Sequence, residues 1–409
     1  MLRQSTDHED YRNLTGRGTI QEVSMLIKSE VEIKALDLSP VAEVIRGGVE
    51  VIEQLAAEWR ELCAEGPCDE PFYRPEWIAA YMRAFAPEKQ LLIITVRVGG
   101  RLRAVLPLVA ERAWFYGFPV RKLRSAAGMH SGRFDLVHGA GDEGEAVLAI
   151  WEWLRTRSDW DLIELQDVPP GGAAEQLLLA AKIDGHPTGL WESLRTPYIP
   201  LPGQGGKLEA ALSRTDAKFR GNLRRRMRKL EAKGPVRLIR FEGADRAALE
   251  RFYELERAGW KGEQGTAIAC DADTRRFYDE AAGAAAAFGY FSLYVLECGG
   301  HPVAIHYGLT HRGRYFVPKL AYDENYKECA PGHLIVHEIL RDAVERGLTE
   351  FDFLGPWMEW KAEWTSEVRP HAWCYVFRQG LLGRALHATK FRLMHAARQM
   401  KRRLGKLSR

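Results

Sequence analysis

Two glycine pairs, Gly99-Gly100 and Gly299-Gly300, lie 200 residues apart in this chain, and each separates two strand-like runs. The runs cover 91–98 and 101–109 around the first pair, and 291–297 and 302–310 around the second. A Gly-Gly pair suits a tight hairpin because both positions accept a positive φ. In each copy a helix-like segment and a further strand follow. A repeat of this length indicates a duplicated domain rather than a solenoid.

The second copy gives the more complete pattern. Apolar spacing predicts a strand over 236–241, helices over 244–259 and 273–288, and a third hairpin strand over 314–321. A helix over 331–345 ends before Gly347, and 349–354 reads as a final strand. The first copy repeats the later part, with a helix over 145–156 and a strand over 161–166. Both copies therefore predict an α/β fold with a mixed (α+β) sheet, although two common hairpins could also coincide by chance.

Length supports the duplication, because 409 residues exceed what one compact core of ordinary size needs. The expected division is a mobile tail over 1–30, a first domain over 31–200, a second domain over 207–380 and a helix over 381–409. The proline- and glycine-rich stretch Ile199–Lys207 marks the boundary between the two domains. No apolar run is long enough to span a bilayer, and the first residues lack the core of a signal peptide, so we expect a cytoplasmic protein.

The cysteines and histidines of the sequence do not form the patterns of a metal site or a disulfide framework. Six cysteines are scattered without a Cys-x-x-Cys pair, which fits neither a disulfide framework nor a zinc knuckle. His333 and His337 share a helix face, but the residues between them lack the Glu of a hydrolytic His-Glu-x-x-His site. We therefore predict no metal.

A basic run over 218–229 holds seven cations and no acid. Such a run is usually a solvated helix face, yet an unbalanced charge of this size favours an anionic neighbour. The candidates are the phosphate of a cofactor, a nucleotide-sugar or lipid-phosphate acceptor, and RNA.

Several motifs in the second copy together suggest a family. They are Asn222–Glu231, Gly299–Ala304, Pro331-Gly332, Glu345–Leu348, Phe351–Leu354 and the Trp360-Lys-x-x-Trp364 pattern. The stretch from Asn222 to Trp364 resembles the GCN5-related N-acetyltransferase (GNAT) fold, in the acetyltransferase-like family associated with cellulose and exopolysaccharide synthesis (the CelD/BcsL type). Two positions depart from that family: Trp360 stands in place of Tyr, and Gly355–Glu359 replaces an Arg-Gly-Asp-like turn.

The resemblance implies tandem GNAT-like acyl-CoA N-acyltransferase domains with acetyl-CoA or another acyl-CoA as co-substrate. The cofactor phosphate that could lie beside the basic run is then the CoA 3′-phosphate. In this superfamily the pantetheine lies between two splayed strands and the pyrophosphate lies on the amides at the start of the next helix, where the dipole favours anions. The corresponding cofactor-binding residues are Lys327, Pro331, Gly332, His333 and Leu334. The usual Gln/Arg-x-x-Gly-x-Gly/Ala loop is absent. In the first copy Asp142, Glu143 and Glu145 would repel a pyrophosphate, so only the second copy should bind CoA.

Acyl transfer needs a neutral amine, an amide for the oxyanion and a route for the proton. Asp352 is a candidate base and Tyr322 a candidate acid, and Asp352 could equally be a solvated or structurally paired strand residue. His306 is another candidate base, with a satisfied half-buried role as the alternative. The acceptor-binding candidates are Arg220, Arg224, Arg228, Lys361 and Trp364.

The function expected from these features is transfer of an acyl group from acyl-CoA to an amine of a cell-envelope polysaccharide precursor or a related small molecule. Acetyl is the acyl group that we expect. Two alternatives stay open. One is aminoacyl-tRNA-dependent transfer of the peptidoglycan-bridge type, although no long helical hairpin is evident and a nucleic-acid partner is disfavoured. The other is a catalytically silent partner protein in exopolysaccharide synthesis.

The C-terminal segment 381–409 carries an apolar stripe at helical spacing and a basic face. The stripe comprises Leu382, Leu386, Thr389, Leu393, Ala397, Met400, Leu404 and Leu407. The basic face comprises Arg384, Lys390, Arg392, Arg398, Lys401, Arg402, Arg403 and Lys406. Such a helix can lie on an anionic membrane surface or dock on its own protein. Membrane binding would place the protein at the inner face of the membrane.

Overall fold

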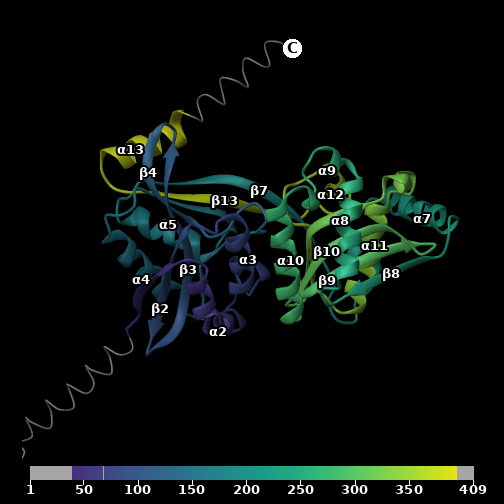
Figure 1. Cartoon of the computed structure of the whole chain (residues 1–409), viewed down its shortest axis with the longest axis horizontal. Coiled ribbons are helices and arrows are strands. Elements are labelled where there is room, and N and C mark those ends of the chain that lie inside the picture. Colours follow the sequence, from purple (N-terminus) through teal and green to yellow (C-terminus); the bar gives the residue numbers. More distant parts are fainter. Residues whose placement is uncertain (1–38, 68, 394–409) are drawn as a thin grey trace, which may run out of the picture.

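A computed structural model of the chain describes residues 39–67 and 69–393. One mixed sheet runs through the whole molecule in the strand order β1-β2-β3-β4-β6-β13-β7-β12-β11-β10-β9-β8, with β5 paired to β3. Helices cover the sheet in each half, and the molecule is elongated along the direction in which the strands follow one another (Figure 1). The expected tail over 1–30 lies outside the described residues.

The first half begins with a strand and two helices and continues with a hairpin. Its elements are β1 (Val41–Gly47), α2 (Glu50–Glu65), α3 (Pro75–Phe85), β2 (Gln90–Val98), β3 (Arg101–Phe115), β4 (Phe118–Ser125), β5 (Val137–His138), α4 (Glu143–Arg155), β6 (Leu162–Val168), α5 (Ala173–Ile183) and β7 (Thr188–Pro200). Gly99 and Gly100 both have positive φ at the predicted turn between β2 and β3, which confirms the role expected of this glycine pair.

The second half repeats the order. Its elements are α6 (Leu208–Leu212), α7 (Ala217–Glu231), β8 (Val236–Phe241), α8 (Arg246–Ala258), α9 (Trp260–Glu263), α10 (Ala272–Ala287), β9 (Phe291–Cys298), β10 (His301–His311), β11 (Arg314–Tyr322), α11 (Pro331–Glu345), β12 (Glu350–Asp352), α12 (Glu359–Ala362), β13 (Val368–Phe377) and α13 (Leu381–Ala388), followed by a π-helical turn over Thr389–Leu393. The side chains of Asp216, Asp245 and Asp271 accept backbone N–H groups at the starts of α7, α8 and α10, as N-caps do.

The strand β13 departs from the expected division of the chain at residue 200. That division assigns β13 to the second domain. In the structure β13 inserts between β6 and β7 of the first half and is antiparallel to both. The end of β7 in turn pairs with β12 of the second half, from Tyr198–Asp352 to Pro200–Glu350. The two halves therefore share strands, and neither half forms its part of the sheet without a strand from the other.

A common core also joins the halves. The ring of Trp77 on α3 lies 5.2 Å from that of Phe277 on α10, edge to face, and Phe72 lies 5.6 Å from Phe316 on β11. These residues belong to one buried cluster that includes side chains from both halves. Packing of this kind holds the two halves in a fixed relation, which positions the cavity described below.

Candidate active site

The strands β11 and β12 part in the middle of the second half. They are parallel and pair over only three positions, ending at Phe316 and Asp352. Beyond this point β11 continues to Tyr322, whereas the chain after β12 turns away through Leu354 and Gly355, both at positive φ. The parting leaves an opening in the sheet beside β11.

A cavity of about 600 Å³ lies on the α10 side of this opening, between the two halves. Its walls come from the loop 129–132 and β7 residues 191–194 of the first half, and from β11, α10 and the loop 354–356 of the second half. Asp167 of β6, Trp373 of β13 and Lys390 complete it. A concave site of this size at a junction between domains is the usual place for a small-molecule substrate.

Three polar side chains of the cavity wall lie close together. The His130 Nδ1 is 3.3 Å from the Tyr278 hydroxyl oxygen, and the Lys319 Nζ is 5.4 Å from the centroid of the Tyr278 ring. Burial, aided by the nearby Lys319 charge, lowers the pKa of His130 to about 4. Burial also lowers the pKa of Lys319 below its ordinary value. At neutral pH His130 is therefore a neutral base, and Lys319 releases its proton more easily than an exposed lysine.

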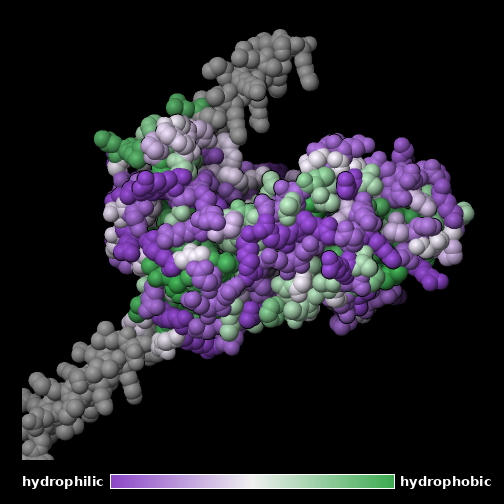
Figure 2. Space-filling model, in the orientation of Figure 1, coloured by the Kyte–Doolittle hydropathy of each residue, from purple (hydrophilic) through white to green (hydrophobic). Residues whose placement is uncertain are grey.

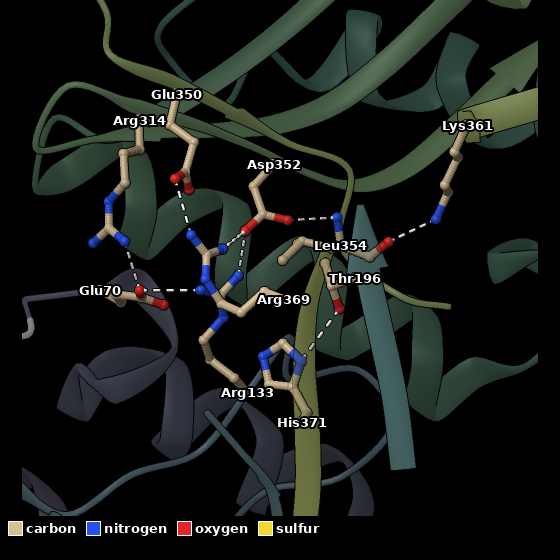
Figure 3. A network of polar contacts seen from close by, with 10 residues as sticks. All are labelled: Glu70, Arg133, Thr196, Arg314, Glu350, Asp352, Leu354, Lys361, Arg369 and His371. Carbon is tan, nitrogen blue, oxygen red and sulfur yellow. Dashed lines mark hydrogen bonds and ion pairs between the residues drawn. The ribbon is translucent and has the colours of Figure 1, made fainter. Parts of the chain in front are cut away.

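A largely buried ion-pair network lies beside the cavity and links five segments of the chain (Figure 3). Its acids are Glu70, Glu350 and Asp352, and its bases are Arg133, Arg314 and Arg369. Burial opposes the charge of Arg133, but the carboxylates of Glu70 and Asp352 raise its pKa well above the ordinary value. Three acids thus balance three bases, as charges at this depth require.

Asp352 belongs to this network and is not placed to act as a base. One carboxylate oxygen accepts from Arg133 and, at 2.9 Å, from Arg369, and the other accepts the Leu354 N–H at 2.8 Å. The side chain is fully buried. These contacts favour the alternative role, that of a structurally paired strand residue. Both oxygens are occupied, by donors from the first half, from β13 and from the turn that follows Asp352.

Lys361 and Trp364 are also structural rather than exposed to an acceptor. The buried Lys361 ammonium donates to the carbonyls of Leu354 (2.6 Å) and Pro356 (3.0 Å), which hold the loop on the cavity wall. Burial lowers the pKa of Lys361 to about 8, although Asp352 opposes this shift. Trp364 is 1% exposed, and its Nε1 donates to the Nδ1 of His333. Neither side chain lines the cavity, and these contacts do not fit the acceptor-binding role predicted for them.

The start of α11 keeps several features expected of a phosphate site. Gly332 is partly exposed, and a Cβ there would meet only ordinary contacts with Tyr322 and Leu320. Lys327 is exposed nearby, while Pro331 and Leu334 are buried.

Glu328 and His333, which lie at this helix start, have contacts that the sequence did not predict. The carboxylate of Glu328 is balanced by Lys233 at 2.9 Å and Lys229 at 3.8 Å, so its charge is compensated. His333 turns inward between Phe219 and Trp364. Burial, with Arg226 nearby, lowers the pKa of His333 to about 4, so it stays neutral at pH 7. Its predicted contact with phosphate is therefore replaced by an aromatic packing role.

The basic helix α7 lies at the far end of the second half from the cavity (Figure 1). Arg220 donates to the carbonyls of Leu212 and Thr215 and so holds the preceding turn. Arg224 and Arg228 are exposed on α7, which packs against α11 and the turn before it. These arginines lie closer to the phosphate candidates than to the cavity, which does not fit the role of acceptor contacts predicted for them.

Tyr322 and His306 are not brought together with Asp352. Tyr322 follows the last paired residue of β11 by six positions, which places it about 20 Å further along the strand. His306 on β10 is fully buried, and neither ring nitrogen has a hydrogen-bond partner within the described part of the chain. Burial lowers its pKa to about 3. The predicted constellation of three catalytic groups is therefore not assembled.

Sequence reasoning did not identify His130, Tyr278 and Lys319, because they come from three separate segments. One signal was present: Pro318 interrupts the third strand of the second copy. Proline is tolerated in a strand where the adjacent strand is missing. Pro318 therefore indicates the place where β11 leaves β12, and Lys319 is the next residue in the sequence.

Within 39–67 and 69–393, no group of three or more His, Cys, Asp or Glu side chains could hold a metal ion. In that part of the chain no helix is both long and apolar enough to cross a bilayer.

Comparison with known proteins concerns the fold and the type of domain. Residues 217–362 match the family model described as an acetyltransferase (GNAT) domain, and domains of this family use acyl-CoA. No curated protein matches the chain. Among solved structures, FemX aligns with a TM-score of 0.54 at 13% identity, covering 82% of this chain and 98% of FemX.

A second solved structure is the C-terminal domain of a protein described as a lysylphosphatidylglycerol synthetase from Agrobacterium fabrum. It aligns with a TM-score of 0.50 at 12% identity, covering 83% of this chain and 95% of that domain. Similarity at this level concerns the fold. The chain therefore has a tandem GNAT-like fold with an acetyltransferase (GNAT) domain in its second half, and it is an acyltransferase enzyme.

Proposed function

We propose that the chain transfers an acyl group from acyl-CoA to an amine of an acceptor that binds in the cavity between the halves. The acceptor class is a cell-envelope polysaccharide precursor or a related small amine. The observation that carries this proposal is the position of the cavity, which lies where β11 and β12 part. A donor on the α11 side of the sheet and an acceptor on the α10 side can meet only through such an opening.

The donor side would use the start of α11. The amides that follow Pro331, together with Lys327, would hold the phosphates of CoA, and the exposed Arg224 and Arg228 add positive charge on the neighbouring helix α7. Acyl-CoA, when bound there, supplies an activated thioester carbonyl. The compensation of Glu328 by two lysines removes the main electrostatic objection to this site.

The acceptor side would use His130 and Lys319. An acceptor amine arrives largely as an ammonium at neutral pH and must lose a proton before it can attack a carbonyl. Burial disfavours the charged form of Lys319, so its neutral amine is the group proposed to take that proton. His130, with a pKa of about 4, is a weak base, and its neutral ring would accept a hydrogen bond from the acceptor amine. Tyr278 lies against both and fixes their relative position.

A test combines turnover with donor binding. We expect Lys319→Met and His130→Phe each to lower thiol release from acetyl-CoA in the presence of amino sugars at least tenfold, which is about 1.4 kcal/mol of barrier. Calorimetry should show unchanged acetyl-CoA binding. Lys182→Met, on the exposed end of α5, is the matched control and should keep full turnover. Undiminished turnover in both cavity variants would contradict the proposed acceptor site.

A second candidate is aminoacyl transfer from tRNA, and the exposed arginines of α7 are the observation that favours it. Arg224 and Arg228 take part in no ion pair among the described side chains, and unpaired cations on one helix face suit a phosphate backbone. Filter binding of tRNA to the wild type and to Arg224→Gln/Arg228→Gln separates the two functions. Salt-sensitive tRNA binding lost in the variant, together with no acetyl-CoA binding, would favour this candidate.

A further inference from the structure

Large apolar side chains are exposed together at one corner of the first half, which we call the apolar corner. It comprises Trp114, Tyr116 and Phe118 at the tip of the β3–β4 hairpin, and Leu381, Leu382 and Leu393 around α13. Trp114 is 76% exposed and Leu381 is 87% exposed. Hydrophobic residues gather at the end of the molecule that carries α13 (Figure 2). A group of exposed aromatic and aliphatic residues of this kind marks an interaction site.

The two parts of the apolar corner are direct neighbours. The Lys390 Nζ, in the turn after α13, lies 6.0 Å from the centroid of the Tyr116 ring. Phe115 of the hairpin and His387 of α13 both contact the ring of Phe377, with centroids at 6.0 and 5.7 Å. The hairpin tip and α13 thus lie side by side, with Phe115 on the α13 face of the hairpin and Trp114 on its other face.

The helix α13 already has a core contact of its own, so its exposed leucines are not needed for docking to the sheet. Leu386 is fully buried against Val120, Leu162 and Tyr375. Lys390, expected on a basic outer face, is instead buried with its ammonium 4.4 Å from the centroid of the Trp191 ring. Leu381, Leu382 and Leu393 lie on the outside after this packing is complete.

The two segments that form the apolar corner carry cations and no acid, and of these cations Arg121 and Lys122 pair with carboxylates outside the segments. The segments 112–122 and 378–393 contain no Asp or Glu, and Arg112, Arg384 and Arg392 are exposed in them. The chain beyond Leu393 adds the cations Arg398, Lys401, Arg402, Arg403, Lys406 and Arg409, again without an acid. Two copies of this corner would repel each other, so the charge argues against a second copy as the occupant and for an anionic surface.

We propose that the apolar corner docks on an anionic phospholipid surface. The rings of Trp114 and Tyr116 suit the boundary between headgroups and acyl chains, and the leucines around α13 can enter the outer part of the acyl layer. The arginines beside them pair with phosphate headgroups. The occupant is a lipid surface because only that partner offers an apolar layer and a dense negative charge together.

Docking would also bring the cavity to the membrane. Trp191 and Lys390, which contact the packed side of α13 and its following turn, line the cavity as well. An acceptor carried on a lipid would then reach the cavity without leaving the bilayer surface. This last step rests on the proposed function, whereas the docking itself does not.

The experiment is vesicle cosedimentation of the full-length protein. Vesicles of phosphatidylglycerol and phosphatidylcholine should bind the wild type at low salt, with at least tenfold weaker binding to pure phosphatidylcholine or at high salt. Trp114→Ser/Leu381→Ser should weaken binding to anionic vesicles at least tenfold. The matched control is Leu179→Ser/Ile183→Ser, two exposed positions on α5, and it should bind as the wild type does. α5 packs beside Cys374 and Val376, on the sheet face opposite to α13.

Circular dichroism would verify that both double variants fold. Removal of residues 394–409 distinguishes the contribution of the apolar corner from that of the residues that follow it. We expect the shortened protein to bind anionic vesicles more weakly but still measurably. Equal binding of Trp114→Ser/Leu381→Ser and the wild type, or complete loss of binding on removal of 394–409, would overturn the proposal. Self-association in sedimentation velocity that the Trp114→Ser/Leu381→Ser change abolishes would assign the corner to a second copy instead. Vesicle binding needs no turnover, so its failure is distinct from failure of the proposed acyl transfer.

Discussion

Asp352 shows how a single carboxylate can shape the cavity without touching its contents. It fixes the Leu354 amide while Lys361 fixes the carbonyls of Leu354 and Pro356, so one turn is held from both sides. Gly132 lies against the same turn, since a Cβ there would come within 2.9 Å of the Leu354 side chain. Removal of one partner of a buried ion pair costs more than the pair contributes, because the other charge is left without compensation.

His306 leads to a prediction about stability and pH. Its folded-state pKa of about 3 lies below the ordinary value of 6.5. The unfolded chain therefore binds more protons between these values, and stability is lost as the pH falls below about 6.5. His306→Leu removes this dependence and two unpaired nitrogens. We expect the variant to be about 1–3 kcal/mol more stable at pH 7.5 and to gain about 2 kcal/mol more at pH 5.

Urea unfolding at both pH values measures the effect. His301→Leu, at the exposed β9–β10 turn, should leave the free energy of unfolding unchanged within about 0.5 kcal/mol. A His306→Leu protein that is less stable than the wild type at pH 5 would show that the buried imidazole has a polar partner and would reopen its role in binding or catalysis.

At the scale of elements, the two halves differ in the charges at the start of one helix, α4 in the first half and α11 in the second. The helix α4 begins with Glu143, its N-cap Asp142 pairs with Arg103, and Glu145 follows in the first turn. The helix α11 has no acid in its first turn and lies against the basic helix α7. Since acids at a helix start disfavour a bound anion, the two starts should differ in phosphate binding.

Substitution at equivalent helix starts tests this difference. Gly332→Asp should weaken acetyl-CoA binding at least tenfold, about 1.4 kcal/mol, because the carboxylate takes the place expected for phosphate. Gly144→Asp, in the first turn of α4 where a Cβ meets nothing within 4 Å, should leave binding unchanged. Calorimetry on the full-length protein provides the measurement. Equal effects of both substitutions would place the donor elsewhere.

Elements whose signals are local were predictable from the sequence, and those that depend on distant partners were not. The Gly-Gly turns, the hairpin strands and the helix that ends before Gly347 follow from nearby residues. The cavity residues His130 and Lys319 meet only through packing between the halves. The contacts of Asp352 and Lys361 do not fit the catalytic and acceptor-binding roles predicted for them. Their partners Arg133 and Pro356 cannot be inferred from the spacing around them.

At the scale of the whole molecule, the shared strands make the two halves interdependent. β13 supplies the central pairing between β6 and β7, and β7 reaches across to β12. Buried backbone groups need hydrogen-bond partners, so a half that lacks its borrowed strand has unpaired edges. A fragment over 200–380 contains β13 without either of its neighbours, and donor binding is better measured on the full-length chain.

Splitting the chain tests this interdependence. Coexpressed pieces 1–205 and 206–409, divided in the exposed glycine-rich turn after β7, should copurify as a one-to-one complex. Each piece expressed alone should aggregate or lack a cooperative thermal transition, because its edge strands are unpaired. A piece that is monomeric and melts cooperatively by itself would show that its half folds without the exchanged strand.

The place of β13 near the end of the chain also sets the order of events during synthesis. Domains usually fold as units while the ribosome is still adding residues, the N-terminal one first. Here the first half is made early, yet the gap between β6 and β7 stays open until residues 368–377 have left the ribosome. The half that appears first is therefore completed last, and its two open edges need protection from other chains while the second half is being made.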